Sequence, residues 1–212
     1  MKKVLVAGAN GQTGRQIVSI LKDKEGYEPV AMVRKETQIP YFEEQNISTV
    51  IGDLEKELSG VVKGMDEVIF AAGSGGDTSD QRTVDIDENG AKSLIDASVD
   101  SNVEKFVMLS SMGTDQPDSI PSLKQYLKSK KVADEYLKSS GLTYSIVKPG
   151  MLTNDEGKSE IQAKERLNKS GKIPRNDVAK VIVQSLNSDI LKNKEVEILE
   201  GQTEIGLALT NI

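Results

Sequence analysis

The chain has 212 residues, with 27 Lys and Arg against 33 Asp and Glu, and it contains no His, Cys or Trp. The length fits one large domain, and the missing residue types exclude Ser-His-Asp triads, thiolate nucleophiles, disulfides and the common zinc sites. The net charge of −6 argues against a general nucleic-acid-binding protein, which would carry a basic surface. Acid–base chemistry must then come from Tyr, Lys, Asp, Glu, a hydroxyl or a bound cofactor.

The chain shows no sign of a membrane or export segment. No apolar run approaches the roughly 18 residues that are needed to cross a bilayer. Met1-Lys2-Lys3 leads directly into an apolar run that is too short for a secretory signal peptide. We therefore expect a soluble cytoplasmic protein whose partner is a small molecule, with neither a membrane nor nucleic acid as a ligand.

Short β-rich apolar runs alternate with longer amphipathic stretches over the first 150 residues. Strands are expected at Val4–Ala7, Pro29–Val33, Ser48–Ile51, Glu67–Ala71, Lys105–Leu109 and Tyr144–Val147. Helices are expected at Gln12–Lys24, Leu58–Lys63, Asp80–Ser101 and Ser122–Ser140. Several strands are almost entirely apolar, as expected when both faces of a sheet are covered. The alternation predicts right-handed βαβ crossovers and a doubly wound, Rossmann-like α/β fold with a parallel sheet.

The character of the sequence changes after Pro149. Residues 151–172 are polar and contain Gly157 and Gly171, which predicts a loop with a short element. A helix at Arg175–Leu186, capped by Asn176 or Asp177, a strand at Glu195–Leu199 and a last short helix are expected to follow. We predict one domain over residues 1–212, in which 151–212 form a small appendage on the substrate side.

The first strand ends in Gly8-Ala9-Asn10-Gly11-Gln12-Thr13-Gly14 and leads into a helix. Gly8 permits a tight turn, Gly11 lets a pyrophosphate approach the backbone, and Gly14 lets helix and strand pack closely. The N–H groups at the helix N-terminus, which begins around Gln12 and Thr13, would hold the phosphate oxygens. A glycine-rich turn without a ligand is the alternative.

The second strand is followed by two cations. Proteins that bind NAD usually place Asp or Glu at this point to hold the ribose diol. Here the strand ends in Arg34 and Lys35, and the Arg34 guanidinium could bind a 2′-phosphate. The pair favours NADP over NAD, and a solvated basic pair is the alternative.

The motif Gly-Ala-Asn-Gly-x-Thr-Gly resembles that of the atypical short-chain dehydrogenase/reductases, the branch that includes NmrA-like and epimerase-related proteins. Further matches follow in order: Gly52-Asp53-Leu54, Phe70-Ala71-Ala72-Gly73, Leu109-Ser110-Ser111, Tyr126-x-x-x-Lys130 and Ile146-Val147-Lys148-Pro149-Gly150. The resemblance covers roughly residues 3–186. It implies that Asp53 and Leu54 border the adenine ring and that Ala71, Ala72 and Gly73 line the cofactor. Lys148 stands where relatives commonly carry Arg.

The resemblance also implies a catalytic group. In the family a Tyr transfers the proton, a Lys lowers the pKa of that Tyr and holds the ribose, and a Ser orients the substrate oxygen. The Tyr-x-x-x-Lys pattern occurs twice, at Tyr126–Lys130 and at Tyr144–Lys148. Four residues of a strand span roughly 13 Å, which separates the second pair, whereas residues four apart on a helix are neighbours.

We therefore predict that Tyr126 and Lys130 act together, with Ser111 as the family's serine in preference to Ser110. Lys130 interrupts the apolar stripe of its helix and requires a polar partner there. A Lys whose ammonium reaches the solvent beside a core Tyr is the alternative, and Ser111 could be an ordinary loop or cap residue.

One further motif is rejected. Asp85-x-Asp87-x-Asn89-Gly90, with Asp96 in the twelfth position, comes close to a calcium-binding loop. Its last residue is Asp rather than Glu, no helix pair flanks it, and the apolar residues that follow continue a helical face. We expect no metal site here.

The leading hypothesis is an NADP(H)-dependent oxidoreductase that transfers a hydride to or from a small carbonyl, enone or flavin-like substrate. The second is a redox sensor that binds NADP(H) without turnover. The third is a nucleotide-sugar epimerase or dehydratase, which would usually have a larger C-terminal region.

Overall fold

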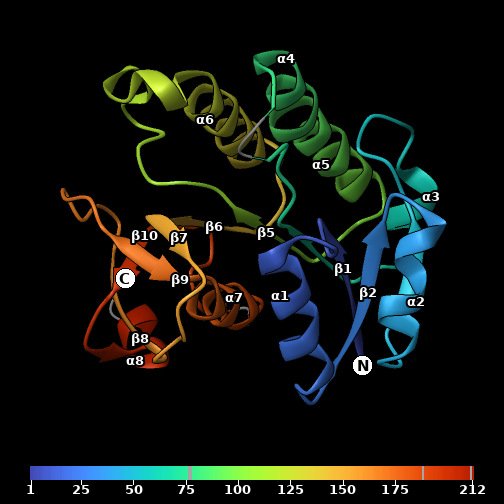
Figure 1. Ribbon diagram of the computed structural model, residues 1–212. Coiled ribbons are helices and arrows are strands. Elements are labelled where there is room, and N and C mark those ends of the chain that lie inside the picture. The colour runs from blue at the N-terminus through green and yellow to red at the C-terminus, as the bar shows by residue number, and fades with distance from the viewer. Residues whose placement is uncertain (76–77, 188, 211) are drawn as a thin grey trace.

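The computed structural model describes residues 1–75, 78–187, 189–210 and 212. Within these residues one nine-stranded sheet forms the centre of the molecule (Figure 1). Its parallel part consists of β3 (Ser48–Ile51), β2 (Tyr27–Val33), β1 (Lys2–Ala7), β4 (Glu67–Phe70), β5 (Lys105–Leu109), β6 (Tyr144–Pro149) and β10 (Lys194–Glu200), in that spatial order. The strands β8 (Glu160–Lys164) and β11 (Thr203–Glu204) extend the β10 edge in antiparallel pairing.

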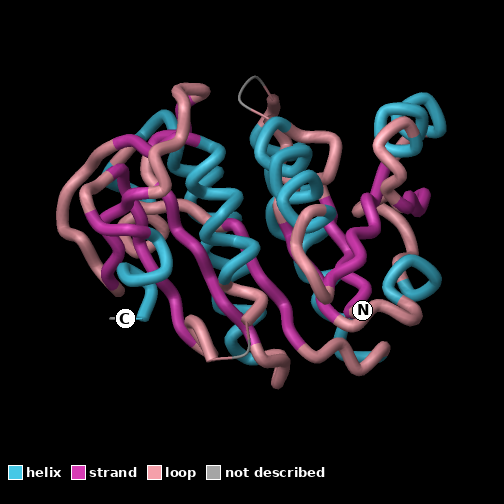
Figure 2. The backbone as a smooth tube through the Cα atoms, turned by 90° about the horizontal axis from the view of Figure 1, so that it is seen from below, coloured by secondary structure: helices cyan, strands magenta, loops and turns pink. Residues whose placement is uncertain are grey.

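Helices cover both faces of this sheet (Figure 2). Buried residues of α1 (Gln12–Lys22), α2 (Ile39–Glu43), α7 (Arg175–Gln184) and α8 (Ile205–Thr210) share one apolar core with the sheet. Those of α3 (Ser59–Val62), α5 (Ala91–Asp100) and α6 (Lys124–Ser139) share the other. This is the three-layer arrangement expected for nearly continuous apolar strands.

A single helical run spans residues 80–100. It begins as α4 (Asp80–Thr83), widens to the π-helix η2 (Val84–Gly90) and continues as α5. Short 3₁₀ turns occur elsewhere, at Glu36–Gln38, Pro117–Ser119 and Pro121–Leu123.

The predicted doubly wound sheet is confirmed, and all six predicted strands of the first 150 residues are present. Ser48–Ile51 and Lys105–Leu109 have the predicted bounds. The run at 80–101, expected as ordinary helix, contains the π-helical turns.

The C-terminal region has more strand than its polar sequence predicts. Residues 151–172 include β7 (Met151–Thr153) and β8, and β7 pairs with β9 (Lys172–Pro174) in a separate two-stranded sheet. The sequence gives little sign of β8, because Ile161 is the one fully buried side chain of that strand. Helix α7 begins after Pro174 without a side-chain cap, so the expected capping by Asn176 or Asp177 is wrong. The buried Asp177 carboxylate instead accepts hydrogen bonds from the backbone N–H groups of Lys158 and Ser159.

The strand order reverses around β1, whose neighbours are β2 and β4. In open α/β sheets such a reversal leaves a crevice beyond the carboxyl ends of the strands, where ligands bind. No helix in the described ranges is long and apolar enough to span a membrane.

Candidate functional site

The glycine loop after β1 allows very close packing. Gly8 has a φ of 84°, and a Cβ placed on it would lie 2.5 Å from the backbone nitrogen of Ala72. A Cβ on Gly14 would lie 2.1 Å from the carbonyl oxygen of Gly8. Gly11 is the N-cap of α1, and no side chain caps this helix. The first N–H groups of α1 are therefore free of side-chain caps, as phosphate binding requires.

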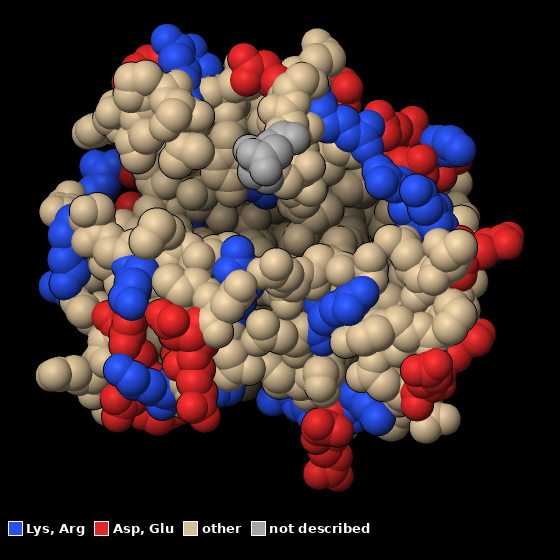
Figure 3. Space-filling model, viewed as in Figure 1, with Lys and Arg blue, Asp and Glu red and all other residues tan. Residues whose placement is uncertain are grey.

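Two cavities meet at this loop. The smaller, of about 360 Å³, is lined by Gly8, Asn10, Gly11, Met32, Arg34, Gln38, Gly52, Asp53, Leu54, Ala72, Gly73, Ser74, Arg82 and Ile86. The larger, of about 850 Å³, lies between α6 on one side and α1, β7 and α7 on the other, and Figure 3 shows a hollow in this face. Gly11, Ala72, Gly73 and Ser74 line both cavities, so the two form one groove across the carboxyl ends of the strands.

The smaller cavity holds two arginines. Arg34 lies at the end of β2, where Gln38 accepts hydrogen bonds from the backbone N–H groups of Arg34 and Lys35. Arg82 reaches the same cavity from α4, and its guanidinium pairs with Glu55 at 2.6 Å. Lys35 is exposed and is not among the lining residues. No sequence motif marks Arg82, which follows Thr78 and Ser79 in a polar segment.

The larger cavity brings Gln12, Thr13, Ala71, Tyr126 and Lys130 together, as the sequence predicts. Tyr126 and Lys130 lie one turn apart on α6, and the Lys130 ammonium is 5.9 Å from the centre of the Tyr126 ring. The Tyr126 hydroxyl has no hydrogen-bond partner within the described ranges and is available to a ligand.

Lys130 is buried, with 3% of its surface exposed. Its ammonium lies 3.1 Å from Asp87 Oδ1, 3.2 Å from the Leu109 carbonyl oxygen and 3.3 Å from that of Ala72. Burial acts to lower the pKa of Lys130, but Asp87, Tyr126 and Asp134 together outweigh burial and raise this pKa above its usual value. Lys130 is therefore a buried cation in the cavity wall, and Asp87 is the polar partner that its burial requires.

Asp87 comes from the segment that resembles a calcium loop. In the structure this segment is the π-helix η2 followed by α5, and Asp87 is completely buried. Its Oδ2 accepts a hydrogen bond from the backbone N–H of Ser74, 2.9 Å away. Asp87 was not among the predicted site residues. A carboxylate on an otherwise apolar helix face nevertheless indicates that a buried cation lies nearby.

The two serines after β5 have different surroundings. The Ser111 hydroxyl donates to the carbonyl oxygen of Met112 at 3.1 Å. Ser110, rather than Ser111, lines the larger cavity, and its hydroxyl donates to Asp134 at 2.7 Å.

Asp134 follows Lys130 by one turn of α6 and is almost completely buried. Burial raises the pKa of Asp134 from 3.8 to about 6, opposed by Lys148, whose ammonium is 3.7 Å away. Lys148 pairs more closely with Glu195, at 2.7 Å. This residue, the partner of Tyr144 in the second Tyr-x-x-x-Lys match, thus belongs to a buried ion network behind the site.

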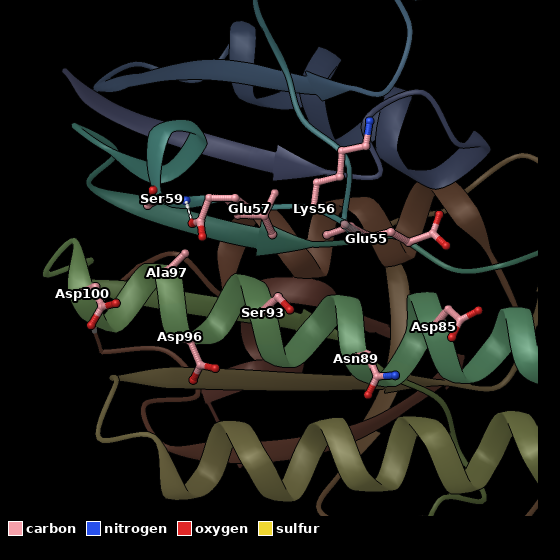
Figure 4. A pocket seen from close by; sticks show the side chains of 12 residues that line it. Glu55, Lys56, Glu57, Ser59, Asp85, Asn89, Ser93, Asp96, Ala97 and Asp100 are labelled. Carbon is pink, nitrogen blue, oxygen red and sulfur yellow. Dashed lines mark hydrogen bonds between the residues drawn. The ribbon is translucent and has the colours of Figure 1, made fainter.

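A third hollow, of about 720 Å³, lies away from the glycine loop, between the β3–α3 connection and α5 (Figure 4). Its wall carries the carboxylates of Glu55, Glu57, Asp85, Asp96 and Asp100. Several of these have partners: Glu55 pairs with Arg82, Glu57 accepts from the Ser59 N–H, and Asp96 accepts from the Tyr136 hydroxyl. No cluster of metal-ligating side chains occurs within the described residues.

Comparison with known proteins gives the family. The model of the NAD(P)H-binding family matches residues 8–189. The chain is 37% identical to an uncharacterized sugar epimerase, YhfK, of Bacillus subtilis, over 99% of this chain and all of that protein. Among solved structures, a putative NAD-dependent epimerase/dehydratase of Bacillus halodurans is 38% identical over both complete chains, with a TM-score of 0.96. The oxidoreductase ylbE of Lactococcus lactis is 29% identical over 99% of this chain and 96% of its own, with a TM-score of 0.87. The chain therefore belongs to the NAD(P)H-binding family and has a Rossmann-like fold.

Proposed function

We propose that this protein is an NADP(H)-dependent oxidoreductase that acts in the cytoplasm on a small carbonyl, enone or flavin-like substrate. One observation carries the proposal: a single groove crosses the glycine loop, with a guanidinium at one end and the Tyr126–Lys130 pair at the other. The cradle at Gly8 and Gly14, which a Cβ would fill, fits a dinucleotide backbone.

The residues along the groove then have distinct roles. Gly8 to Gly14, with Asn10, Gln12 and Thr13, hold the pyrophosphate, and Arg34 binds the 2′-phosphate with Lys35 adding to the local positive potential. Asp53 and Leu54 border the adenine, and Ala71, Ala72 and Gly73 line the cofactor's path. When bound, NADPH supplies the hydride.

The protein itself must donate or accept the proton that accompanies hydride transfer. Tyr126 lines the cavity beside Lys130, and a positioned Tyr hydroxyl can act as a general acid or base. Asp87 and two backbone carbonyls fix the position of the Lys130 ammonium. Tyr126 thus donates or accepts the proton at the substrate oxygen.

The cofactor preference can be tested by titrating the purified protein with NADPH and with NADH. An Arg–phosphate contact is worth about 1.5–3 kcal/mol, so Arg34→Ala should weaken NADPH binding about 10- to 100-fold and leave NADH binding unchanged. Lys22→Ala, at the far end of α1, removes the same charge and should change neither affinity. Equal affinities of the wild type for the two nucleotides would refute the preference.

The proton transfer can be tested with a panel of carbonyls, quinones and flavins, followed through NADPH absorbance. Tyr126→Phe should lose about 100-fold or more of the turnover rate while its NADPH affinity stays within about twofold of wild type. A variant that keeps full activity would exclude Tyr126 as the proton donor. Tight NADPH binding without turnover of any substrate would favour the redox-sensor function.

A second candidate function is favoured by the epimerase names of the Bacillus relatives. An epimerase oxidises and re-reduces its sugar and therefore consumes no net cofactor. Incubation with nucleotide sugars, followed by chromatography of the products, separates this function from a reductase, which requires stoichiometric NADPH.

A further inference from the structure

The larger cavity contains one cation that no acidic group neutralises. Arg175, the first residue of α7, lines the cavity together with Leu152 of β7, on the side opposite α6. Its guanidinium forms no ion pair in the described part of the chain, and it donates a hydrogen bond to the neutral Asn154 side chain at 2.8 Å.

The other cations of this cavity are already paired. Lys130 is held by Asp87, and Lys124 pairs with Asp118 at 2.8 Å. The guanidinium of Arg175 presents five N–H donors in a planar fork, which matches the two oxygens of a carboxylate. The contact with Asn154 uses one nitrogen and orients the fork.

Apolar side chains line the same cavity as this cation. Leu152 is partly buried on the Arg175 side, and Leu123 on the facing side keeps 43% of its surface exposed. Pro121 extends the same wall. A ligand that fills this part of the cavity therefore meets an apolar surface beside one unneutralised guanidinium.

We propose that Arg175 binds a carboxylate of the substrate, so that the substrate is a carbonyl or enone with an apolar body and a carboxylate at the end away from Tyr126. This inference rests on the proposed oxidoreductase function, and it names the substrate class of the same site. In this arrangement Arg175 determines which hydride acceptors bind, and Tyr126 donates or accepts the proton.

The test uses two probes of the same shape, cinnamate and its neutral amide, cinnamamide. Their binding to the full-length protein saturated with NADP⁺ is measured by calorimetry. Because a hydrogen bond to a charged group is worth about 1.5–3 kcal/mol, cinnamate should bind the wild type about tenfold or more tightly than cinnamamide. Arg175→Gln should abolish that preference, and Arg175→Lys should keep part of it. Lys172→Gln, on the neighbouring strand β9, removes an exposed charge that is paired with Asp155 and should leave the preference intact.

The possible outcomes are distinct. If Arg175→Gln keeps the carboxylate preference but binds NADPH more weakly, the guanidinium serves the cofactor phosphates and the proposal is wrong. If the wild type binds both probes equally, or binds neither, the proposal is also wrong. If NADPH itself does not bind, the proposed function fails, and the same probe pair measured on the unliganded protein still decides the role of Arg175. Should Arg175→Gln not fold, Arg175→Lys decides through its reduced preference.

Discussion

Lys130 shows how a buried cation is made tolerable. Removing an ammonium group from water is unfavourable, and a single carboxylate within a few ångströms is the usual compensation. Here Asp87 supplies the opposite charge, two backbone carbonyls accept hydrogen bonds from the ammonium, and the Phe70 ring centre lies 5.3 Å from it. Asp87 is therefore a positioning residue that acts through Lys130.

Loss of the Asp87 charge should be costly. Asp87→Asn leaves the Lys130 ammonium buried without its counter-charge, and we expect the free energy of unfolding to fall by about 3–5 kcal/mol in urea titrations. Asp85→Asn, two residues earlier on the same helix and partly exposed, should stay within about 0.5 kcal/mol of wild type. Equal stability of the two variants would mean that the Asp87–Lys130 pair contributes nothing.

At the scale of elements, the site depends on how closely α1 approaches the turn after β1. Gly14, in the first turn of α1, faces the carbonyl oxygen of Gly8, while Gly8 faces the backbone of Ala72 beyond β4. The turn after β1, the start of α1 and the segment after β4 thus meet with no space for a methyl group. The first N–H groups of α1 can point into the groove because this contact fixes the start of the helix.

Alanine substitutions can test the contact. Gly14→Ala places a methyl group against backbone atoms, so we expect a loss of about 1–3 kcal/mol of stability together with weaker NADPH binding. Gly60→Ala, at an exposed position of helix α3, meets no atom within 4 Å and should be neutral or stabilising by up to about 1 kcal/mol. Thermal unfolding with and without NADPH measures both effects. If the two variants behaved alike, the close approach would have no importance.

At the scale of the whole molecule, the C-terminal region is part of the same folded unit as the glycine-loop half. β10 pairs with β6, and α7 packs against α1, so one apolar core contains Val4 and Ile17 as well as Val178 and Leu209. Behind the site, the buried Asp134 and Lys148 and the half-buried Glu195 join α6, β6 and β10. Protonation of this network is therefore coupled to global unfolding.

The pH dependence of stability should report on Asp134. Its pKa is raised to about 6 in the folded protein, mainly by burial, with Lys148, Ser110, Lys130 and Glu195 as its surroundings. A raised carboxyl pKa means that the folded state binds the proton first, so this contribution is present at low pH and is lost as pH rises through 6. Relative to Asp134→Asn, the wild type should gain about 2 kcal/mol of unfolding free energy as pH falls from 7 to 4. A difference that does not change with pH would contradict the raised pKa.

The sequence predicts the fold well because its strands are apolar and its helices are amphipathic at regular spacing. Helix periodicity also correctly places Tyr126 beside Lys130, and it predicts that Lys130 needs a partner. That partner, Asp87, lies 43 residues away in the chain. Its contact with Lys130 depends on how two helices pack, and no local sequence pattern encodes that packing. Arg82 and Arg175 were missed for the same reason, because each reaches its cavity from an element whose position is set by tertiary contacts.

The π-helix η2 determines how the sequences of relatives must be aligned with this one. A π-helix bonds each N–H to the carbonyl five residues earlier, so it holds an additional residue compared with α-helical turns. Removing one residue from 84–90 would rotate everything before it by about 100° relative to α5. Arg82 would then leave the wall of its cavity. Relatives that differ by a one-residue gap in this helix therefore present different side chains to the nucleotide, even where the flanking sequences agree.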